Sequence, residues 1–198
     1  LKIVEIPDSV TQVGAGAFSG CTSLTTLKIG KGVTTFTADL SVTSNITGLF
    51  VSECTSLTEI IVDEANQTFS SVDGVLFDKD KTTLIHYPSG KNNSKYVIPD
   101  GVSTVGAGAF AGCTTLETLV LSDNVGYVNA YAFYNASNLT TLEVGKGLRF
   151  INSNYQNKGT VYMDCFPFSD CEKLTTINVD ADNPYYSSAD GVLFNKDK

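Results

Sequence analysis

The sequence predicts a β-rich repeat solenoid, and three observations carry this prediction. A motif with apolar residues spaced L-x-x-L-x-L recurs along the chain, and its basic period is 23 residues. The last two apolar residues of each motif alternate with polar ones, which is typical of a strand with one buried face. Hydrophobic residues make up 42% of the 198 residues, enough for a folded core. One such unit cannot bury its own apolar face, so we expect the units to stack, with parallel strands on a concave face.

The first element of each repeat is the predicted strand. A partial copy occupies residues 1–6, and complete copies begin at Leu24, Leu57, Leu116, Leu139 and Leu174. Alternation turns the last two apolar residues of each copy inward and leaves the residue between them exposed. Ile61 and Val120 are apolar residues at this exposed position, so we predict that they form a ligand-contact surface. The alternative is that strand propensity alone placed these β-branched residues.

The second element is a turn that ends three residues before each motif. Its last position holds a small residue: Cys21, Cys54, Cys113, Ala136 and Cys171. Cysteines at one repeat position should have parallel Cβ vectors and be separated by the strand spacing of about 4.7 to 4.9 Å, outside the usual Cβ separation of a disulfide. We therefore expect buried, reduced thiols. Cys165 is not at this position, and a bridge from Cys165 to Cys171 remains open.

The chain also contains a longer repeat that is made up of several 23-residue units. Residues 1–36 align with 116–151 at an offset of 115, and residues 62–81 align with 179–198 at an offset of 117. We therefore predict a single solenoid over 1–198 with about 1.7 copies of a supermodule. Residues 1–81 and 116–198 are homologous in this scheme, and 82–115 provide a linking segment and a repeat. We expect the chain to be part of a longer repeat protein.

A hairpin module interrupts the 23-residue rhythm between Asp73 and Pro88. The apolar run 75–77, the polar turn 78–81 and the returning run 84–87 predict two antiparallel strands. His86, the single histidine, lies on the returning strand without a second histidine or a Cys-x-x-Cys motif nearby. We interpret it as a residue that packs in the hairpin, not as part of a zinc site or a catalytic triad.

Two insertions enlarge the turn at equivalent positions of the two supermodules. They fall between Phe36 and Cys54 and between Ile151 and Cys171, and add 10 and 12 residues to the 8-residue spacing of other coils. The second insertion carries the candidate ligand-binding residues Tyr155, Gln156 and Tyr162. Tyrosine offers rigid contact area and amides offer adaptable hydrogen bonds. The alternative is that the loops are only tolerated, since added loop length costs little closure entropy.

Charge and spacing also disfavour several classes of function. Thirteen basic and twenty-one acidic residues give a net charge of −8, which disfavours a nucleic-acid partner. No apolar run approaches the roughly 18 to 20 residues of a membrane helix. The segment from Asp180 lacks the glycine and glutamate of a calcium-binding EF-hand loop, so we interpret Asp190 and Gly191 as a turn. We expect no cofactor, no metal and no enzymatic activity.

Residues 98–116 carry the motif that suggests a family. The run Ile98-Pro99-Asp100-Gly101-Val102, followed by Phe110, Cys113 and Leu116, resembles the repeat of the BspA-like leucine-rich repeat proteins, and residues 183–194 resemble their irregular module. The resemblance covers nearly the whole chain. It implies a leucine-rich-repeat solenoid from a secreted or surface-attached protein of a host-associated microbe, with adhesion to host extracellular matrix proteins or other cells.

We therefore expect a non-enzymatic extracellular binding or adhesion module. Its partner would be a protein or glycan ligand, such as a host extracellular matrix protein, and the signal and anchor would lie outside this sequence. The alternatives are a purely structural stalk and an accessory targeting region of a larger secreted enzyme.

Overall fold

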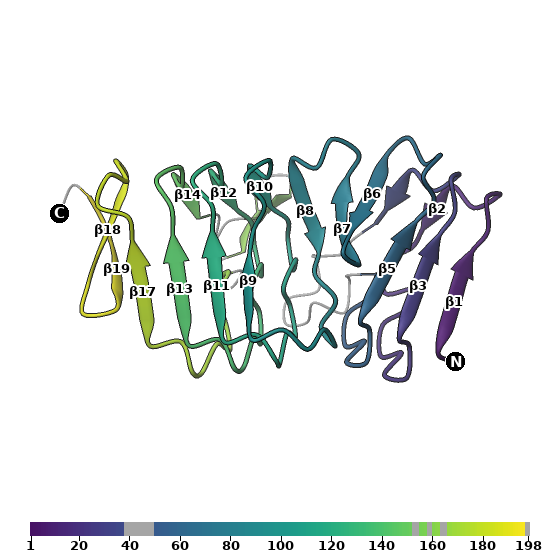
Figure 1. Ribbon diagram of the computed structural model, residues 1–198, viewed down its shortest axis with the longest axis horizontal. Coiled ribbons are helices and arrows are strands. Elements are labelled where there is room, and N and C mark those ends of the chain that lie inside the picture. The colour runs from purple at the N-terminus through teal and green to yellow at the C-terminus, as the bar shows by residue number, and fades with distance from the viewer. Residues whose placement is uncertain (38–49, 152–154, 158–159, 163–165, 197–198) are drawn as a thin grey trace.

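The chain winds into a β-solenoid of about six turns, as the repeats predict. The computed structural model describes residues 1–37, 50–151, 155–157, 160–162 and 166–196, with the backbone alone for 155–157 and 160–162. The described residues contain strands and turns and no helix. The coils follow one another along the long axis, and the two ends of the chain lie at opposite ends of the molecule (Figure 1).

One strand from each regular coil lies on what we call the long-strand face. The first parallel sheet contains β1 (Ile3–Ile6), β3 (Thr26–Ile29) and β5 (Glu59–Val62), and the second contains β9 (Lys95–Val97), β11 (Thr118–Leu121), β13 (Thr141–Val144) and β17 (Thr176–Val179). Register confirms the 23-residue period, because Val4 pairs with Leu27 and Leu119 with Leu142. The predicted inward residues are buried in the inner coils and half-buried at Val4, Ile177 and Val179.

Threonine hydroxyls connect successive coils just before the long strands. The Oγ1 atoms of Thr25, Thr58 and Thr140 donate to backbone carbonyl oxygens one coil earlier, at 2.9, 3.2 and 3.0 Å. Each coil thus adds a side-chain bond to the backbone bonds that hold the stack together. The threonine-rich composition therefore serves coil stacking in part.

A second set of strands lies on the return paths of the coils after β1, β3, β9, β11 and β13, and we call these the short strands. They are β2 (Gln12–Val13), β4 (Thr35–Phe36), β10 (Thr104–Val105), β12 (Tyr127–Val128) and β14 (Phe150–Ile151). Pairing is parallel between neighbours, with β2 beside β4 and with β10, β12 and β14 side by side. Each strand has one outward residue followed by one inward residue, so the sequence shows no alternation that would reveal it.

The predicted hairpin is confirmed as part of a three-stranded meander. β7 (Val75–Asp78) pairs antiparallel with β8 (Thr83–His86), and β8 continues into parallel pairing with β10. An additional strand, β6 (Phe69–Val72), pairs with β7 across Asp73 and Gly74. Both turn residues have positive φ, 49° and 75°, as a type I′ turn requires. Asp190 and Gly191 make the same turn between β18 (Tyr186–Ala189) and β19 (Val192–Asn195).

Strand β7 separates two hydrophobic cores. Val75 and Phe77 belong to the core cluster of the C-terminal coils, whereas Leu76 belongs to the cluster of the N-terminal coils. All three side chains are buried, which explains the continuous apolar run in a strand covered on both faces. In Figure 1 the meander lies between the two long-strand sheets.

The cysteines at the repeat position are free thiols, and three of the four confirm the packing interpretation. Cys54 and Cys113 are buried and Cys171 is partly buried. The Sγ atom of Cys54 donates to the carbonyl oxygen of Phe18 at 3.0 Å, and burial raises the pKa of this thiol to about 11. The prediction was wrong for Cys21, which is exposed because its turn, the first of the chain, has a neighbouring turn on one side only. Cys165 lies outside the described residues.

Candidate functional site

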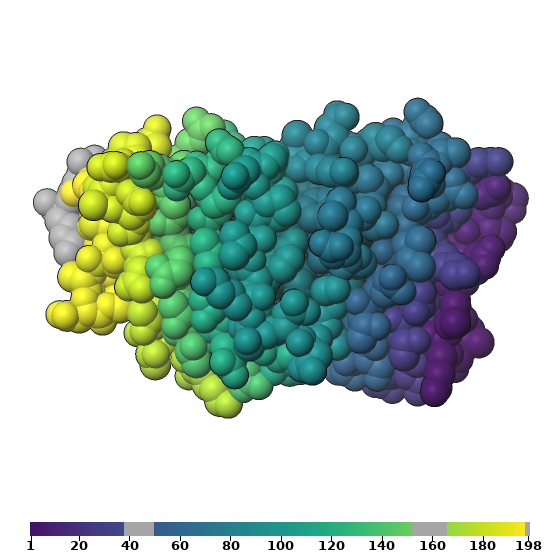
Figure 2. Space-filling model, in the orientation of Figure 1, coloured from purple at the N-terminus to yellow at the C-terminus, as the bar shows by residue number. Residues whose placement is uncertain are grey.

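The outward residue in the middle of each long strand forms a row across the long-strand face. In the first sheet Glu5, Lys28 and Ile61 lie side by side in register. In the second sheet the row continues with Val97, Val120, Glu143 and Asn178. The row therefore holds charged, amide and apolar side chains on one face, which Figure 2 shows as a continuous surface from the N-terminal to the C-terminal coils.

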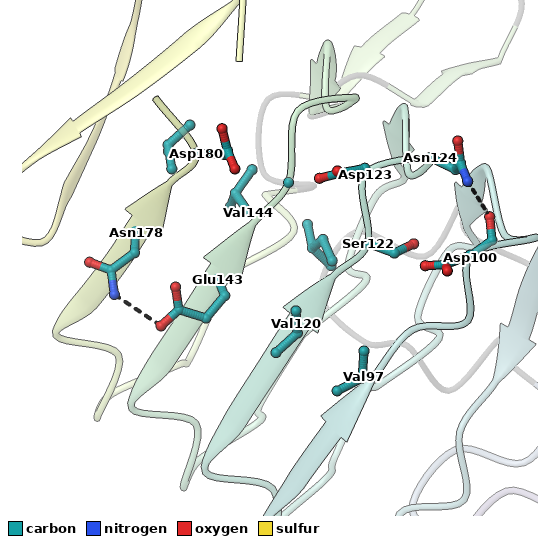
Figure 3. Close-up of a pocket in the computed structure, with 13 residues that line it drawn as sticks. Val97, Asp100, Val120, Ser122, Asp123, Asn124, Glu143, Val144, Asn178 and Asp180 are labelled. Atoms are coloured by element: carbon teal, nitrogen blue, oxygen red, sulfur yellow. Dashed lines mark hydrogen bonds between the residues drawn. The ribbon is translucent and has the colours of Figure 1, made fainter. Parts of the chain in front are cut away.

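Two hollows lie where these strands end and the chain turns away from the face. The N-terminal hollow, of about 470 Å³, is lined by Glu5, Ile6, Pro7, Asp8, Lys28, Ile29, Gly30, Ile61 and Asp63. The C-terminal hollow, of about 650 Å³, contains the second sheet's central row and the turns that follow it (Figure 3). Both volumes fall in the range of ligand-binding clefts.

The two hollows are built on the same frame. Asp8, Gly30 and Asp63 line the first hollow, and the residues at the equivalent repeat positions, Asp123, Gly145 and Asp180, line the second. In each frame the first aspartate accepts a hydrogen bond from a backbone N–H one coil later. Lys31 is the donor to Asp8 and Lys146 is the donor to Asp123, both at 3.1 Å.

The side chains that face the hollows differ in charge. In the N-terminal hollow, Lys28 lies 3.9 Å from Glu5, and Lys31 lies 3.1 Å from Asp8. The hydrogen bond from the Lys31 side chain is the main cause that lowers the pKa of Asp8. The equivalent of Lys31 is Lys146, whose Nζ instead lies 3.2 Å from Asp182, outside the lining of the C-terminal hollow.

The C-terminal hollow therefore combines an apolar pair with several carboxylates. Val97 and Val120 are neighbours on β9 and β11, and the carboxylates around them are Asp100, Asp123, Glu143 and Asp180. Figure 3 shows these groups around one open space, with the Asn178 amide donating to Glu143 Oε1 at 3.0 Å. Hydrogen bonding to Asn178 and to backbone groups orients the polar rim.

The structure places the two predicted strand residues in different hollows. Ile61 is 39% exposed on β5, the edge strand of the first sheet, and lines the N-terminal hollow. Val120 lines the C-terminal hollow but is less exposed than predicted, because it has a neighbour on both sides, Val97 and Glu143. Sequence reasoning missed Val97, which is 52% exposed, because its coil lacks the leucine motif.

For the candidate residues of the second insertion, the structure describes the backbone alone. β15 (Tyr155–Asn157) and β16 (Thr160–Tyr162) form an antiparallel pair in which Tyr155 is opposite Tyr162. The side chains of Tyr155, Gln156 and Tyr162 lie outside the described residues, and so do residues 38–49 of the first insertion. Their role in ligand binding stays a prediction.

His86 and Asp180, which were considered for metal or acid–base chemistry, make packing and turn contacts. His86 is buried on β8 with its ring 6.0 Å from that of Phe50, and burial lowers its pKa to about 4. Asp180 accepts a hydrogen bond from the Asp182 N–H at 2.9 Å, as in a turn. Within the described ranges, no three His, Cys, Asp or Glu side chains are grouped as metal ligands, and no helix could cross a membrane.

Comparison with known proteins agrees with the repeat architecture. The BspA type leucine rich repeat region matches residues 1–91 and 86–189 in six copies. The chain belongs to the BspA type leucine rich repeat family. No curated protein matches the sequence of this chain.

Solved structures of bacterial proteins share the fold of this BspA type repeat region. A leucine-rich repeat protein from Eubacterium ventriosum is 24% identical with a TM-score of 0.69, over 91% of this chain and 42% of that protein. A leucine rich cell surface protein from Faecalibacterium prausnitzii is 20% identical with a TM-score of 0.54, over 91% of this chain and 60% of that protein. The chain thus spans less than two thirds of either protein, and the likeness shows the fold alone.

Proposed function

We propose that the chain is a non-enzymatic binding module of an extracellular or cell-surface protein, and that its C-terminal hollow holds an extended basic segment of a protein ligand. The observation that carries this proposal is the apolar pair Val97 and Val120 inside a rim of carboxylates. A host extracellular matrix protein is the class of ligand that we propose. The surface location is supported by the family and by the cell-surface description of the Faecalibacterium structure.

A lysine or arginine side chain matches both parts of this lining. Its aliphatic stem can pack on Val97 and Val120, while its charged head meets Glu143 or Asp123. Complementary charge mainly adds specificity and association rate, so we expect binding to weaken as salt concentration rises. The hollow is open along the face, which suits a chain segment that continues across neighbouring coils.

The N-terminal hollow and the second insertion are proposed as additional contact regions. Ile61 offers apolar surface beside the Glu5 and Lys28 pair, so that hollow suits a ligand segment of mixed charge. Tyr155, Gln156 and Tyr162 are proposed to add contacts from the insertion. Shortening residues 152–166 to the spacing of Val105 to Cys113 should then weaken binding and leave the fold intact.

The test introduces a charge into the apolar pair. Val120→Lys should lower the affinity for a matrix protein that binds the unmodified chain by about tenfold or more, because it places a positive charge where the basic segment packs. Thr114→Lys adds the same charge at an exposed turn residue and should leave affinity unchanged. Binding to immobilised matrix proteins is measured by surface plasmon resonance at two salt concentrations.

Two results would reject the proposal. The first is equal affinity of Val120→Lys and Thr114→Lys for the bound matrix protein. The second is that the unmodified chain binds no member of a matrix-protein panel, which would favour a structural stalk.

A further inference from the structure

Serine, threonine or glutamine occupies the two positions before the inward residue in three of the short strands and in β8, which pairs in parallel with β10. The pairs are Thr11 and Gln12, Thr34 and Thr35, Thr82 and Thr83, and Ser103 and Thr104. The first residue of the pair has a stacking role. Thr34 Oγ1 donates to the Thr11 carbonyl oxygen at 3.2 Å, and Ser103 Oγ donates to that of Thr82 at 3.3 Å.

Two adjacent coils depart from this pattern at all four positions. The pairs there are Gly126 with Tyr127, and Arg149 with Phe150. Neither Gly126 nor Arg149 has a hydroxyl, so both coils lack the bond that Thr34 and Ser103 make. The backbone pairing is unchanged, because Gly126 N–H donates to Ser103 and Arg149 N–H donates to Gly126 in the same pattern. The fold therefore does not require these four residues.

Three of the substituted residues, Tyr127, Arg149 and Phe150, form one exposed cluster, which we call the aromatic patch. The rings of Tyr127 and Phe150 are stacked, with centroids 5.3 Å apart and planes 11° apart, and the residues are 39% and 54% exposed. The guanidinium carbon of Arg149 lies 5.2 Å from the centre of the Tyr127 ring. Gly126 leaves room for this side chain, since a Cβ there would lie 3.2 Å from Arg149 Nε.

The aromatic patch borders a hollow and is not part of the hydrophobic core. Tyr127, Val128, Asn129 and Phe150 line a space of about 400 Å³. The core is supplied by the inward residues of the same strands, Val128 and Ile151. Two exposed aromatic rings at positions where other coils have threonine or glutamine are thus available to a ligand.

We propose that the aromatic patch binds an acidic glycan, with a pyranose ring against Tyr127 and Phe150 and the sugar carboxylate on Arg149. The C–H groups on one face of a pyranose pack well on aromatic rings. A guanidinium pairs with a carboxylate through two parallel hydrogen bonds, and no described carboxylate forms an ion pair with Arg149. The Asn129 amide, at the same hollow, can bond a sugar hydroxyl. This site is on a different sheet from the two hollows of the long-strand face.

The test uses oligogalacturonate, a chain of carboxylated pyranoses, and its methyl ester, which has the same rings without charge. The unmodified chain should bind the acid more tightly than the ester in isothermal titration calorimetry. Tyr127→Gln with Phe150→Thr should lower affinity for both sugars at least tenfold. Arg149→Thr should lower affinity for the acid to that for the ester. These replacements are the residues that the first two coils carry at the same positions, so the fold should tolerate them.

A transplant variant tests the site in the opposite direction. Thr11→Gly, Gln12→Tyr, Thr34→Arg and Thr35→Phe together place the same four residues on the first two coils, and the number of oligogalacturonate sites should rise from one to two. Val120→Lys should leave sugar binding unchanged, which separates this proposal from the proposed protein-binding function.

Three outcomes would overturn the glycan proposal. They are absence of oligogalacturonate binding, equal affinity for the acid and the ester, and full affinity in the Tyr127→Gln, Phe150→Thr variant. A proline-rich peptide that binds the unmodified chain and loses affinity in this variant, while neither sugar binds, would assign the patch to a peptide instead.

Discussion

Two buried asparagines hold the chain where it leaves the long-strand face. The amide nitrogen of Asn66 donates to the carbonyl oxygens of Gly30 and Val33, both at 3.0 Å, and its Oδ1 accepts from two backbone N–H groups. Asn183 makes the same four types of bond one supermodule later. A short polar segment in the sequence gave no sign that Asn66 is fully buried, because its burial depends on a coil 33 to 36 residues earlier.

Removal of this amide should therefore destabilise the protein strongly. Asn66→Ala leaves two carbonyl and two N–H groups without their partner, and we expect a loss of about 2 to 4 kcal/mol in the free energy of unfolding. Gln67→Ala, at the exposed neighbour, should change it by less than about 0.5 kcal/mol. Urea denaturation compares the two variants, and similar midpoints would contradict the structural role of Asn66.

His86 should make stability depend on pH. Its pKa is about 4 in the folded protein, where burial disfavours the charged form, and 6.5 is the ordinary value that we assign to the unfolded chain. Between these values the unfolded state binds more protons, so stability is fully present above pH 6.5 and is lost as pH falls toward 4.

We expect a loss of about 2 kcal/mol between pH 7 and pH 5, a range above the ordinary pKa of most carboxylates. Because His86 is the single histidine, His86→Gln should remove most of this slope. Urea denaturation at several pH values measures it. An equal slope in both proteins would show that His86 is not its source.

At the scale of elements, glycines set how closely coils approach at the turns after the long strands. A Cβ added at Gly147 would overlap the carbonyl oxygen of Asp123, and the equivalent Gly32 has the same relation to Asp8. Both aspartates belong to the frames of the hollows. The close approach of one coil to the next thus also fixes the shape of the candidate site.

Gly147→Ala should force these two coils apart. We expect a loss of about 2 kcal/mol or more in stability, since backbone atoms have to move to relieve the overlap. Gly14→Ala is the matched control, because its Cβ would meet no atom within 4 Å. Thermal unfolding monitored by circular dichroism should show a lower midpoint for Gly147→Ala alone.

Elements with a strong periodic signal were predictable, and those without one were not. Alternation in each leucine motif located the long strands other than β9, and the apolar run 75–77 located β7. The two-residue strands such as Gln12–Val13 have a single inward residue, which leaves no period to detect. The same limit applies to the site: Ile61 and Val120 follow from alternation, whereas Tyr127 and Phe150 stand out only when their register with polar residues of other coils is known.

At the scale of the whole molecule, the division of the core by β7 makes the stack less uniform than a simple repeat. Leu57 lies in the N-terminal cluster and Leu139 in the C-terminal cluster, and both are fully buried. Repeat proteins gain stability from contacts between neighbouring coils, so a local defect has most effect on its own side. The meander between the clusters is therefore expected to limit the spread of unfolding.

Hydrogen exchange can test this division. Leu57→Ala should lower local stability by about 3 kcal/mol and raise exchange in residues 1–62 roughly a hundredfold, with a much smaller rise in residues 98–148. Leu139→Ala should give the reverse pattern. Equal acceleration in both halves for either variant would show that the two clusters unfold as one unit.

The shared frame of the two hollows has an evolutionary consequence. The side chains of Asp8 and Asp123 hold the turns by accepting backbone N–H groups, so outward residues such as Glu5 and Val120 are not needed to hold these turns. A duplicated supermodule can therefore inherit a working scaffold at once and then accumulate changes at positions such as Glu5 or Val120 without a loss of folding. Successive duplications along such a gene would produce a series of clefts that diverge in preference while keeping a common architecture.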